Sequence, residues 1–432
     1  MLAQETMARS FDPAEFVKGD EVHRDVYASP EIFELEMNRL FARSWLLVGH
    51  ESQVTKAGDY YLTSVATRPT IIVRDASGAV HAFLNSCPHR GAPLRTDARG
   101  NTPRFVCPYH SWTFKTDGTL AGMPLRSEYG ADFDWEGHCL HKVGEVAIYR
   151  GFLFVSAAPV TDLETFLGDF AGAFDDFVDR APDGEIEAQP IVQRHVYRGN
   201  WKLYLENLND ALHFTSTHAS AATALQMVED KSRLSPEMML GAINPTPNQM
   251  RDHTFVKYYP FGHSYTGGAP QLGGAKVGPG DPVFDAVAAR RGEDEAQRVI
   301  GTSRHISLLY PSASVNARMS TIRIVRPIAV DRTEIVALLF KLKGAPESVY
   351  KTTVFYNWAS GSPSSFALAD DIEMFERLQR TYRDDSRRWS SVHRGSHDET
   401  QRDGQEVSIT GTSEAYIKNQ FDAWGALMRE EA

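Results

Sequence analysis

Two short segments of the sequence each place a cysteine beside a histidine. The first reads Cys87-Pro-His89, and the second, after 17 intervening residues, reads Cys107-Pro-Tyr-His110. Thiolate with imidazole is a mixed soft and borderline ligand set. It suits either a zinc ion or a two-iron cluster with cysteines on one iron and histidines on the other. The four side chains are therefore candidate metal ligands.

The distribution of these ligands favours an iron–sulfur cluster over zinc. A zinc finger of the C₂H₂ type carries both cysteines in one half and both histidines on a following helix, whereas here each segment supplies one of each from a loop between predicted strands. Gly91, Pro88 and Pro108 suit tight loops whose backbone N–H groups can bond to cluster sulfurs. We therefore predict a Rieske-type [2Fe–2S] cluster, with a zinc site as the alternative.

The third cysteine, Cys139, lies between His138 and His141 and superficially resembles another ligand cluster. Adjacent residues on a strand point to opposite faces, and the sequence offers no evident fourth ligand there. We interpret Cys139 as a structural residue. Three cysteines also cannot build a disulfide framework.

Two further histidines lie five residues apart, in the segment Asp210-Ala-Leu-His213-Phe-Thr-Ser-Thr-His218. Residues five apart on a regular helix diverge by about 140° around its axis, so both rings reach one metal ion only if the helix unwinds between them. We expect the unwinding at 215–217, because Thr and Ser side chains compete for backbone hydrogen bonds. The pair predicts a metal site on a distorted helix.

A carboxylate from elsewhere must complete this second site. Two histidines and one carboxylate are the ligand set of non-haem Fe(II), which leaves positions open for O₂ and substrate. The best candidate is Asp371, with Asp370 and Glu373 as rivals. An electron-delivering cluster and an O₂-reactive iron are complementary halves of one mechanism, so each site supports the other.

Composition and charge exclude several classes of protein. With 42% hydrophobic and 23% charged residues, the 432-residue chain is globular in composition, and its length favours two domains. The 45 basic residues are scattered among 56 acidic ones, and the formal charge of −11 disfavours nucleic acid as a partner. Without an apolar run of about 18 residues or a signal-peptide pattern, we expect a cytoplasmic protein with no membrane partner.

Hydrophobic periodicity and turn signals predict the elements that position these ligands. In the first half we expect a helix over 29–44, short antiparallel strands over 57–157, and a helix that begins at a capping box of Thr161 and Glu164. In the second half, a strand from 194 leads into a helical segment over 202–218. The remaining expectations are an irregular loop at 267–282, two or three strands over 305–342, and helices over 364–384 and 413–428.

The motifs resemble those of a known family, the ring-hydroxylating Rieske oxygenases, over nearly the whole chain. They are Cys-Pro-His-Arg-Gly, Cys-x-Tyr-His-x-Trp, Asn-Trp-Lys and Glu-Asn-x-x-Asp-x-x-His-x₄-His. The resemblance implies an α+β fold, with an N-terminal Rieske antiparallel β domain and a catalytic domain whose antiparallel sheet is flanked by helices (helix-grip, START-like). It implies a helical segment at 1–44 packing on the catalytic domain, a Rieske domain at 45–160 and a catalytic domain at 161–432.

The resemblance also implies a role for each candidate residue. His213, His218 and Asp371 would ligate the mononuclear iron, since the second acid of the family's acidic pair is its ligand. Asp210 would correspond to a bridging aspartate that hydrogen-bonds a cluster histidine of the neighbouring subunit, and Asn207 would lie near the iron. Four residues would ligate the [2Fe–2S] cluster: Cys87, His89, Cys107 and His110.

The function that the resemblance implies is that of a terminal oxygenase component. Such a component receives electrons from NADH through a separate ferredoxin or reductase and uses O₂ to hydroxylate an aromatic compound, most simply by cis-dihydroxylation. The sequence has no Gly-x-Gly-x-x-Gly fingerprint, so nicotinamide and flavin would act on that separate protein. Electron transfer between subunits implies a homotrimer, with or without a small beta subunit.

Two alternative functions stay open at this point. The same scaffold could support monooxygenation or demethylation, and a Rieske electron carrier would need no O₂ chemistry, although it leaves the second histidine pair unexplained. The ending over 413–428 resembles large subunits that act on aromatic acids, which favours an aromatic carboxylate substrate. Arg323 and Arg326 could pair with a carboxylate, but solvated strand residues are the simpler interpretation.

Overall fold

The computed structural model describes residues 11–230, 245–268, 278–302, 304–384, 388–396 and 399–429. The chain divides into two compact units. The small unit is Phe41–Thr161, and the large unit combines Met1–Leu40 with Asp162–Ala432. The sequence predicted changes of domain at 44/45 and 160/161. Most of the irregular loop expected at 267–282 lies outside the described residues.

The small unit is built from three antiparallel sheets, as predicted. Its strands are β3 (Leu46–His50), β4 (Asp59–Val65), β5 (Arg68–Arg74), β6 (Val80–Leu84), β7 (Arg99–Asn101), β8 (Arg104–Val106), β9 (Thr113–Lys115), β10 (Leu120–Gly122), β11 (Glu145–Tyr149) and β12 (Phe152–Ser156). The sheet orders are β11-β12-β3, β6-β5-β4-β7 and β10-β9-β8. Aromatic side chains fill the core around the loops that follow β6 and β8, and the buried cysteines of both loops belong to that core.

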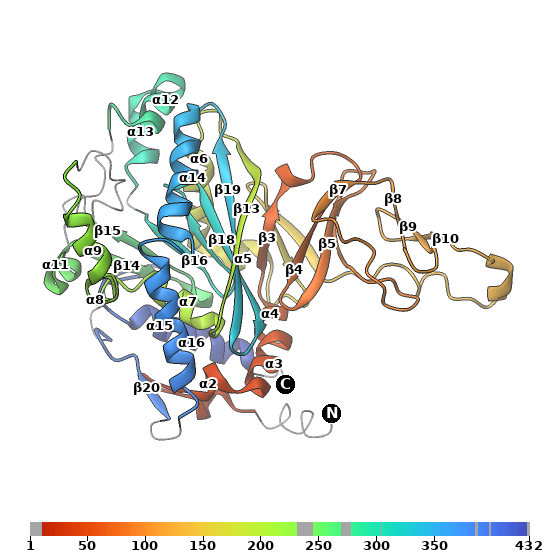
Figure 1. The fold of residues 1–432 in the computed structure, drawn as a ribbon, viewed down its shortest axis with the longest axis horizontal. Helices are drawn as coiled ribbons and strands as arrows, with labels where there is room; N and C mark the ends of the chain where they lie inside the picture. The colour runs from red at the N-terminus through yellow and green to blue at the C-terminus, as the bar shows by residue number, and fades with distance from the viewer. Residues whose placement is uncertain are drawn as a thin grey trace. The chain divides into compact units, whose positions relative to one another are not determined.

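The large unit is organised by a nine-stranded antiparallel sheet of order β13-β19-β18-β17-β16-β15-β14-β22-β21 (Figure 1). Four strands occupy the stretch where two or three were predicted, because a turn at 310–312 that contains Pro311 divides the first part into the paired strands β16 and β17. The strands are β13 (Ile186–Tyr197), β14 (Thr254–Tyr258), β15 (Ser264–Gly268), β16 (Ile306–Leu309), β17 (Ala313–Asn316), β18 (Thr321–Ala329), β19 (Arg332–Leu342), β21 (Glu399–Asp403) and β22 (Glu406–Thr410).

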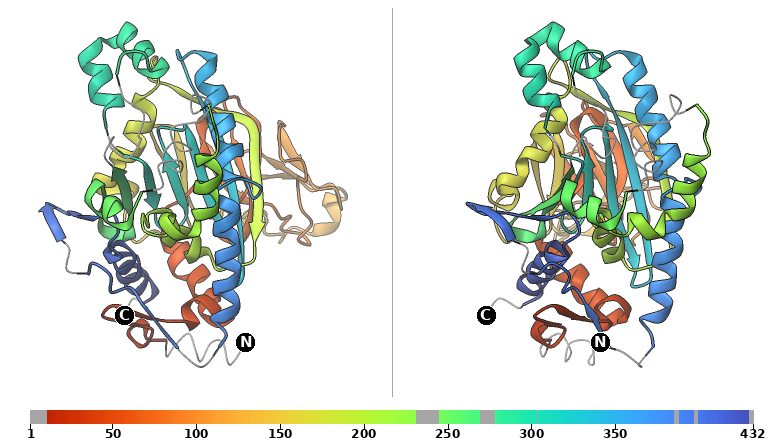
Figure 2. Two further views of the ribbon diagram at one scale, coloured as in Figure 1. Left: turned by 60° about the vertical axis from the view of Figure 1, so that its left-hand side comes forward. Right: turned by 90° about the vertical axis from the view of Figure 1, so that its left-hand side faces the viewer.

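Helices flank this sheet. Two of them, α14 and α15, lie along one side of it, with α14 against β19 and α15 against β13 (Figures 1 and 2). The sequence predicted α15 within 364–384 but did not predict α14, whose apolar residues follow no clear helical period. The helices are α7 (Trp201–Leu208), α8 (Phe214–Thr217), α9 (Ala219–Gln226), α11 (Pro247–His253), α12 (Pro282–Arg291), α13 (Glu293–Ile300), α14 (Glu347–Gly361), α15 (Leu368–Thr381) and α16 (Ala415–Met428).

Two predicted helix starts have different outcomes. Ser29 caps its helix as predicted, accepting a hydrogen bond from Ile32 N at 3.2 Å, but 29–44 is two helices, α3 (Pro30–Asn38) and α4 (Leu40–Arg43). The prediction of a capping box formed by Thr161 and Glu164 is wrong. Asp162 is the cap of α5 (Leu163–Leu167) and accepts from Thr165 N at 2.8 Å, because its carboxylate lies one residue closer to the helix. A turn and a second helix, α6 (Gly172–Asp179), follow.

The chain's ends add peripheral elements to the large unit. The strands β1 (Val17–Lys18), β2 (Glu21–His23) and β20 (Trp389–Ser391) form a separate small sheet. The C-terminal helix α16 lies within the predicted range 413–428, and its buried apolar side chains include Tyr416, Phe421, Trp424 and Leu427. Across the part of the chain that the structure describes, no helix has both the length and the apolar character needed to cross a membrane.

Candidate metal centres

The two Cys-His loops of the small unit share one backbone geometry. In the first, Gly91 N donates to Cys87 O at 2.8 Å, and in the second, Ser111 N donates to Cys107 O at 3.0 Å. Each cysteine N–H also donates to the carbonyl five residues ahead, at 2.8 Å in both loops. The fourth residue after each cysteine has a left-handed backbone, with φ of 74° at Gly91 and 58° at Ser111. The loops therefore present equivalent cysteines to one space.

The side chains of these loops fit a [2Fe–2S] cluster with mixed ligands. Both thiols are 2% exposed, whereas the rings of His89 and His110 are partly exposed, with centroids 4.7 Å apart. The Nδ1 atoms of both histidines are buried and have no hydrogen-bond partner among the residues that the structure describes. Buried polar atoms are normally paired, so two orphaned nitrogens on facing loops indicate a ligand-binding role. Because the cysteines are buried and the histidines are partly exposed, the imidazole side of the centre faces solvent.

The surroundings of the loops support the same interpretation. The ring of Trp112 stacks on His89, with a centroid distance of 4.7 Å and an interplanar angle of 2°. Burial, reinforced by the neighbouring Cys107, raises the pKa of Cys87 to about 11, so a thiolate there needs a cationic partner. Cys139 is engaged elsewhere: its sulfur accepts from Leu120 N at 3.4 Å.

In the large unit, the Asn-Trp-Lys motif anchors the start of α7. Asn200 is the cap of the helix, and its side-chain oxygen accepts from Lys202 N at 3.1 Å. Lys202 forms a buried ion pair with Glu36, which also accepts hydrogen bonds from the indoles of Trp201 and Trp424 at 3.0 and 2.8 Å. The satisfied, buried charges fix α7 in one position relative to its neighbours.

The helical backbone is interrupted between α7 and α8, and this interruption positions the histidine pair. The predicted unwinding at 215–217 is wrong, because Phe214–Thr217 forms the short helix α8 and Thr217 N donates to His213 O at 2.7 Å. The non-helical backbone lies on both sides instead, at 209–212 and at His218, whose φ and ψ are −97° and 19°. A helix cannot continue through His218, and this change of direction lets the two rings converge.

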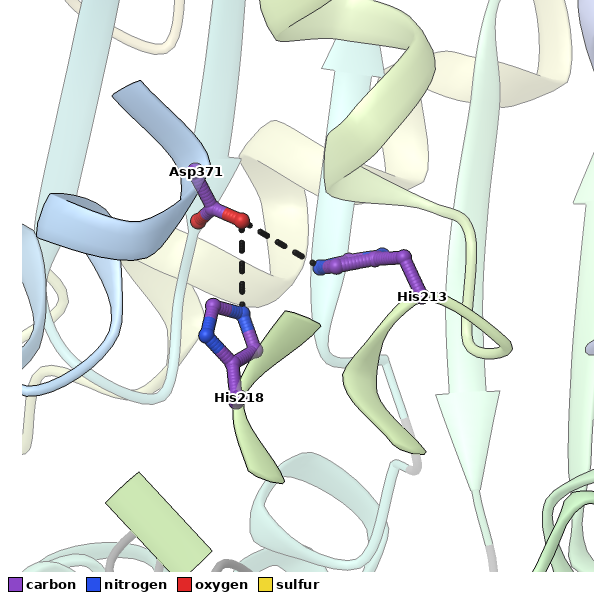
Figure 3. Close-up of side chains that lie close together, drawn as sticks. All are labelled: His213, His218 and Asp371. Carbon is purple, nitrogen blue, oxygen red and sulfur yellow. Dashed lines mark ion pairs between the residues drawn. The ribbon is translucent and has the colours of Figure 1, made fainter. Parts of the chain in front are cut away.

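His213, His218 and Asp371 come together in the structure (Figure 3). The Nε2 atoms of His213 and His218 lie 3.6 and 3.3 Å from the same carboxylate oxygen, Asp371 Oδ1. One ligand atom from each residue lies within 4.8 Å of the others, which is the spacing of a site that can hold one metal ion. Asp371 lies in the first turn of α15, far from the histidines in sequence.

Hydrogen bonds on the outer side orient all three groups. His213 Nδ1 lies 2.5 Å from Asp210 O, and His218 Nδ1 lies 3.4 Å from Asp370 Oδ2. Donation from Nδ1 leaves the Nε2 lone pair of each ring aimed at the shared space. Asn207 Nδ2 donates to Asp371 Oδ1 at 3.2 Å.

The same contacts separate Asp371 from its two rivals. Asp370 contacts the outer nitrogen of His218, and Glu373 is exposed and pairs with Arg377 at 2.8 Å. Burial lowers the pKa of His213, whereas the hydrogen bonds and charges of Asp371 and Asp370 outweigh burial at His218 and raise its pKa. The sequence did not predict that Asp370 orients His218, because adjacent acids in a sequence indicate only that either one could be the metal ligand.

Asp210 lies beside the histidine pair and holds a further contact that the sequence did not predict. Its Oδ1 accepts from Leu212 N at 2.8 Å and from Arg394 Nη2 at 3.2 Å. Arg394 also pairs with Glu414 at 3.3 Å. The Asp210 side chain is 20% exposed. The sequence gives no signal for the pairing of Arg394 with Asp210, because the two residues are far apart in the chain and Arg394 belongs to no recognisable motif.

A cavity of about 620 Å³ opens onto the three converging residues. It is lined by α7 and α8 at one end, by α14 along its length, and by residues around β17 and α12 at the other end. Arg323 lines the cavity, whereas Arg326 pairs with Glu334 at 3.2 Å. A cavity of this size accommodates an aromatic molecule next to a metal site.

Comparison with known proteins identifies both units. Residues 44–147 match the Rieske [2Fe-2S] domain, and residues 183–406 match the ring hydroxylating alpha subunit (catalytic domain). The chain belongs to the ring-hydroxylating Rieske oxygenase alpha subunits. The family excludes the zinc alternative for the first centre and the electron-carrier alternative for the whole chain. Its members use a [2Fe–2S] cluster and a mononuclear iron, with electrons from NADH supplied through a separate reductase.

Relatives of this alpha subunit span most of its length. It is 31% identical over 421 residues to the anthranilate 1,2-dioxygenase large subunit of Acinetobacter baylyi, covering 94% of this chain and 89% of the relative. It is 33% identical over 372 residues to the toluate 1,2-dioxygenase subunit alpha of Pseudomonas putida, covering 83% and 78%. Naphthalene 1,2-dioxygenase from Rhodococcus sp. has the same fold, with a TM-score of 0.79, 23% identity and 98% coverage of both chains.

Proposed function

We propose that this alpha subunit cis-dihydroxylates an aromatic carboxylate. The observation that carries the proposal is the convergence of His213, His218 and Asp371 at one end of a cavity that also contains buried arginines. Relatives over most of the chain are named as dioxygenases of anthranilate, 2-halobenzoate and toluate, all of which are aromatic acids. The reaction adds both atoms of O₂ to adjacent ring carbons and consumes an electron pair and two protons.

The proposal assigns ligands to each metal group. His213, His218 and Asp371 hold the mononuclear iron through Nε2, Nε2 and a carboxylate oxygen. When bound, the cluster supplies single electrons and the iron supplies the redox chemistry that O₂ requires. Four residues hold the [2Fe–2S] cluster: Cys87, His89, Cys107 and His110.

The other residues of the site orient these ligands and the substrate. Asp370 and the carbonyl of Asp210 fix the two imidazoles by their outer nitrogens, and Asn207 fixes the Asp371 carboxylate. Outer hydrogen bonds of this kind select one ring tautomer and raise the basicity of the ligand. The cavity walls exclude bulk water and hold the aromatic ring against the ligands.

The proposed assembly is a homotrimer, with or without a small beta subunit, in the cytoplasm. Asp210 of one subunit would hydrogen-bond His110 of the partner subunit and carry electrons from cluster to iron. Asp210 suits this role because its carboxylate is partly exposed and, among the described residues, its hydrogen bonds engage only Oδ1. A carboxylate next to an imidazole ligand couples proton movement to electron transfer.

Isotope labelling tests the reaction. The purified protein is supplied with NADH, a ferredoxin–reductase pair and ¹⁸O₂, and is offered anthranilate, benzoate, 2-chlorobenzoate and 3-methylbenzoate in separate reactions. We expect at least one acid to yield a diol, or the catechol derived from it, that carries two labelled oxygens. Turnover of aromatic hydrocarbons alone, with every acid inert, would contradict the proposed substrate class.

Monooxygenation or N-demethylation is the second candidate. The N,N-dimethyl phenylurea N-demethylase subunit alpha of Sphingobium sp. is 34% identical over 208 residues, which is 48% of this chain. A demethylase releases formaldehyde and incorporates one labelled oxygen for each turnover. Formaldehyde release from N,N-dimethylaniline or an N,N-dimethyl phenylurea, with no doubly labelled product from the acids, would favour this second candidate.

A further inference from the structure

Four arginines line the substrate cavity: Arg180, Arg304, Arg318 and Arg323. Two of them have partners on the protein. Arg304 forms an ion pair with Asp176 at 2.7 Å, and Arg323 is held by the hydroxyl groups of Tyr204 and Tyr356. Arg180 and Arg318 form no ion pair within the described part of the chain. Among the described residues, the charges of these two arginines therefore have no acid partner in the cavity.

Arg180 follows the last turn of α6 and is 7% exposed. Its Nε atom is buried and has no hydrogen-bond partner. The nearest acids are already engaged, since Asp176 pairs with Arg304, and Asp281 caps α12 by accepting from Val283 N and Phe284 N at 2.8 and 3.0 Å. A buried guanidinium without an acid partner is costly unless another group supplies one.

Arg318 lies in the turn between β17 and β18, close enough for its charge to act on Arg180. Burial and then this charge lower the pKa of Arg180 to about 10, so the Arg180 guanidinium carries a charge at neutral pH. His305 lines the same part of the cavity and has a buried Nδ1 without a partner. Burial lowers the pKa of His305 to about 4, which makes it a neutral hydrogen-bonding group.

We propose that Arg180, Arg318 and His305 form a receptor for the acid group of the substrate. This inference rests on the proposed function, an aromatic acid as substrate. A carboxylate placed between two like charges removes their repulsion and gains charge-assisted hydrogen bonds, and it also satisfies the orphaned nitrogens. Guanidinium groups bind carboxylates through paired N–H donors, which fixes the orientation of the acid as well as its charge.

The receptor lies at the end of the cavity away from the iron ligands. The turn between β17 and β18 lies near the start of α14, because Thr321 at the start of β18 pairs with Leu339 near the end of β19, which leads into α14. Figure 1 shows α12 at this end of α14 and α15 toward its other end. The cavity wall on α14 runs from Ser348 to Gly361, a helical rise of about 20 Å. An acid group held at this end directs the far side of the aromatic system toward His213, His218 and Asp371.

This arrangement predicts the substrate shape and the site of attack. The preferred substrate is an aromatic acid long enough to reach from the receptor to the iron ligands. Oxidation then falls on ring carbons distant from the carboxylate, and the product keeps its acid group. For 2-naphthoate, the diol forms on the ring that carries no carboxylate.

Arg318→Gln tests the receptor, because Arg318 is only partly buried and glutamine keeps a polar, hydrogen-bonding side chain while removing its charge. Calorimetric titration and kcat/KM are measured with 2-naphthoate and with its uncharged methyl ester. We expect affinity and kcat/KM for the acid to fall by about 30-fold or more, and those for the ester to stay within about twofold. Arg332→Gln, at the exposed first residue of β19, is the matched control and leaves both probes unchanged.

Two results would overturn the receptor: equal losses for acid and ester in Arg318→Gln, or a diol on the carboxylate-bearing ring of 2-naphthoate. Failure of the proposed function has a different signature, because the wild-type protein would then oxidise naphthalene and no acid. Binding of 2-naphthoate still tests the receptor in that case. If wild type binds 2-naphthoate and Arg318→Gln does not, the receptor is supported. If the variant binds as tightly as wild type, or if wild type does not bind 2-naphthoate at all, the receptor is overturned.

Discussion

The two metal centres are built in opposite ways. The four proposed cluster ligands come from two neighbouring loops of the small unit that share one backbone geometry. The proposed iron ligands come from two remote segments, a broken helix at 209–218 and the first turn of α15, which the large sheet and its helices bring together. The cluster site is therefore a property of local sequence, and the iron site is a property of the fold.

The hydrogen bonds around the ligands differ in the same sense. At the cluster, the Nδ1 atoms of His89 and His110 have no partner on the protein, so the metal group itself completes the loops. At the iron site, Asn207, Asp370 and the Asp210 carbonyl already orient the ligands. Loss of iron should thus leave the large unit folded, whereas loss of the cluster should loosen the small unit.

The largest expected effect comes from breaking the fold-dependent site alone. Asp371→Ala removes the carboxylate that both histidines face, so turnover should fall at least about a thousandfold while the visible absorption of the cluster stays unchanged. Glu373→Ala, two residues further along α15, is the control, because Glu373 is exposed and pairs only with Arg377. Activity and iron content are measured together. Equal losses in both variants would mean that α15, and not Asp371, was disturbed.

Asp210→Asn tests the link between the two centres. The substitution keeps size and shape but removes the charge that would pair with an imidazole of the partner subunit, so steady-state turnover should drop by about 100-fold. Both metal sites should stay loaded, and dithionite should reduce the cluster as in wild type. Asp331→Asn, an exposed acid paired with Arg383, provides the control. Normal turnover in Asp210→Asn would refute the proposed electron route.

The contrast between local and fold-dependent sites also explains what could be predicted from sequence. Cys87, His89, Cys107 and His110 are recognisable because ligand type and spacing are visible within one stretch. The resemblance to the family already favours Asp371 over Asp370, but the contact of Asp370 with the outer nitrogen of His218 depends on the three-dimensional position of α15.

Other features depend on contacts that spacing does not encode. The break in the helix lies at 209–212 and His218 rather than at 215–217, because tertiary contacts decide where a helix yields. The pairing of Arg394 with Asp210 joins residues far apart in sequence. Arg180 and Arg318 likewise meet only in the folded cavity, where neither has a sequence neighbour that announces a binding role.

The two units should also respond differently to pH. Burial raises the pKa of Glu206 in the large unit to about 7 from 4.5, so its contribution to stability is present below pH 4.5 and is lost as pH rises through 7. At Asp75 in the small unit, burial is outweighed by hydrogen bonds from Ser77 and His81, which lower the pKa to about 2. The contribution of Asp75 is present above pH 3.8 and is lost as pH falls through 2.

Glu206→Gln isolates the first of these effects. At pH 4, Glu206 is largely protonated in both the folded and the unfolded chain, so the variant should be about as stable as wild type. At pH 8 the variant should be more stable, by a free energy of unfolding on the order of 2–3 kcal/mol, because it has no buried charge to form. Urea unfolding of the large unit, followed by intrinsic fluorescence at both pH values, measures the difference. No gain at pH 8 would show that Glu206 is ionised without penalty.

The smallest expected effect tests the equivalence of the two cluster loops. Gly91 and Ser111 occupy the same left-handed backbone position, where an L side chain costs about 1 kcal/mol. A Cβ at Gly91 would meet only Ser86 Oγ, at 3.8 Å, so Gly91→Ala carries that backbone cost without a clash. Gly91→Ala should destabilise the small unit by about 1 kcal/mol, and Ser111→Gly should stabilise it by a similar amount.

The rate at which the cluster absorption bleaches in urea reports both changes. Gly122→Ala, on β10 with open space around it and an ordinary backbone, is the control and should change this rate little. Opposite signs at Gly91 and Ser111 would mean that each loop sets its own geometry before the cluster binds. The same sign at both positions would mean that the cluster imposes the geometry on the loops, which would make even the local site depend on its metal rather than on its sequence.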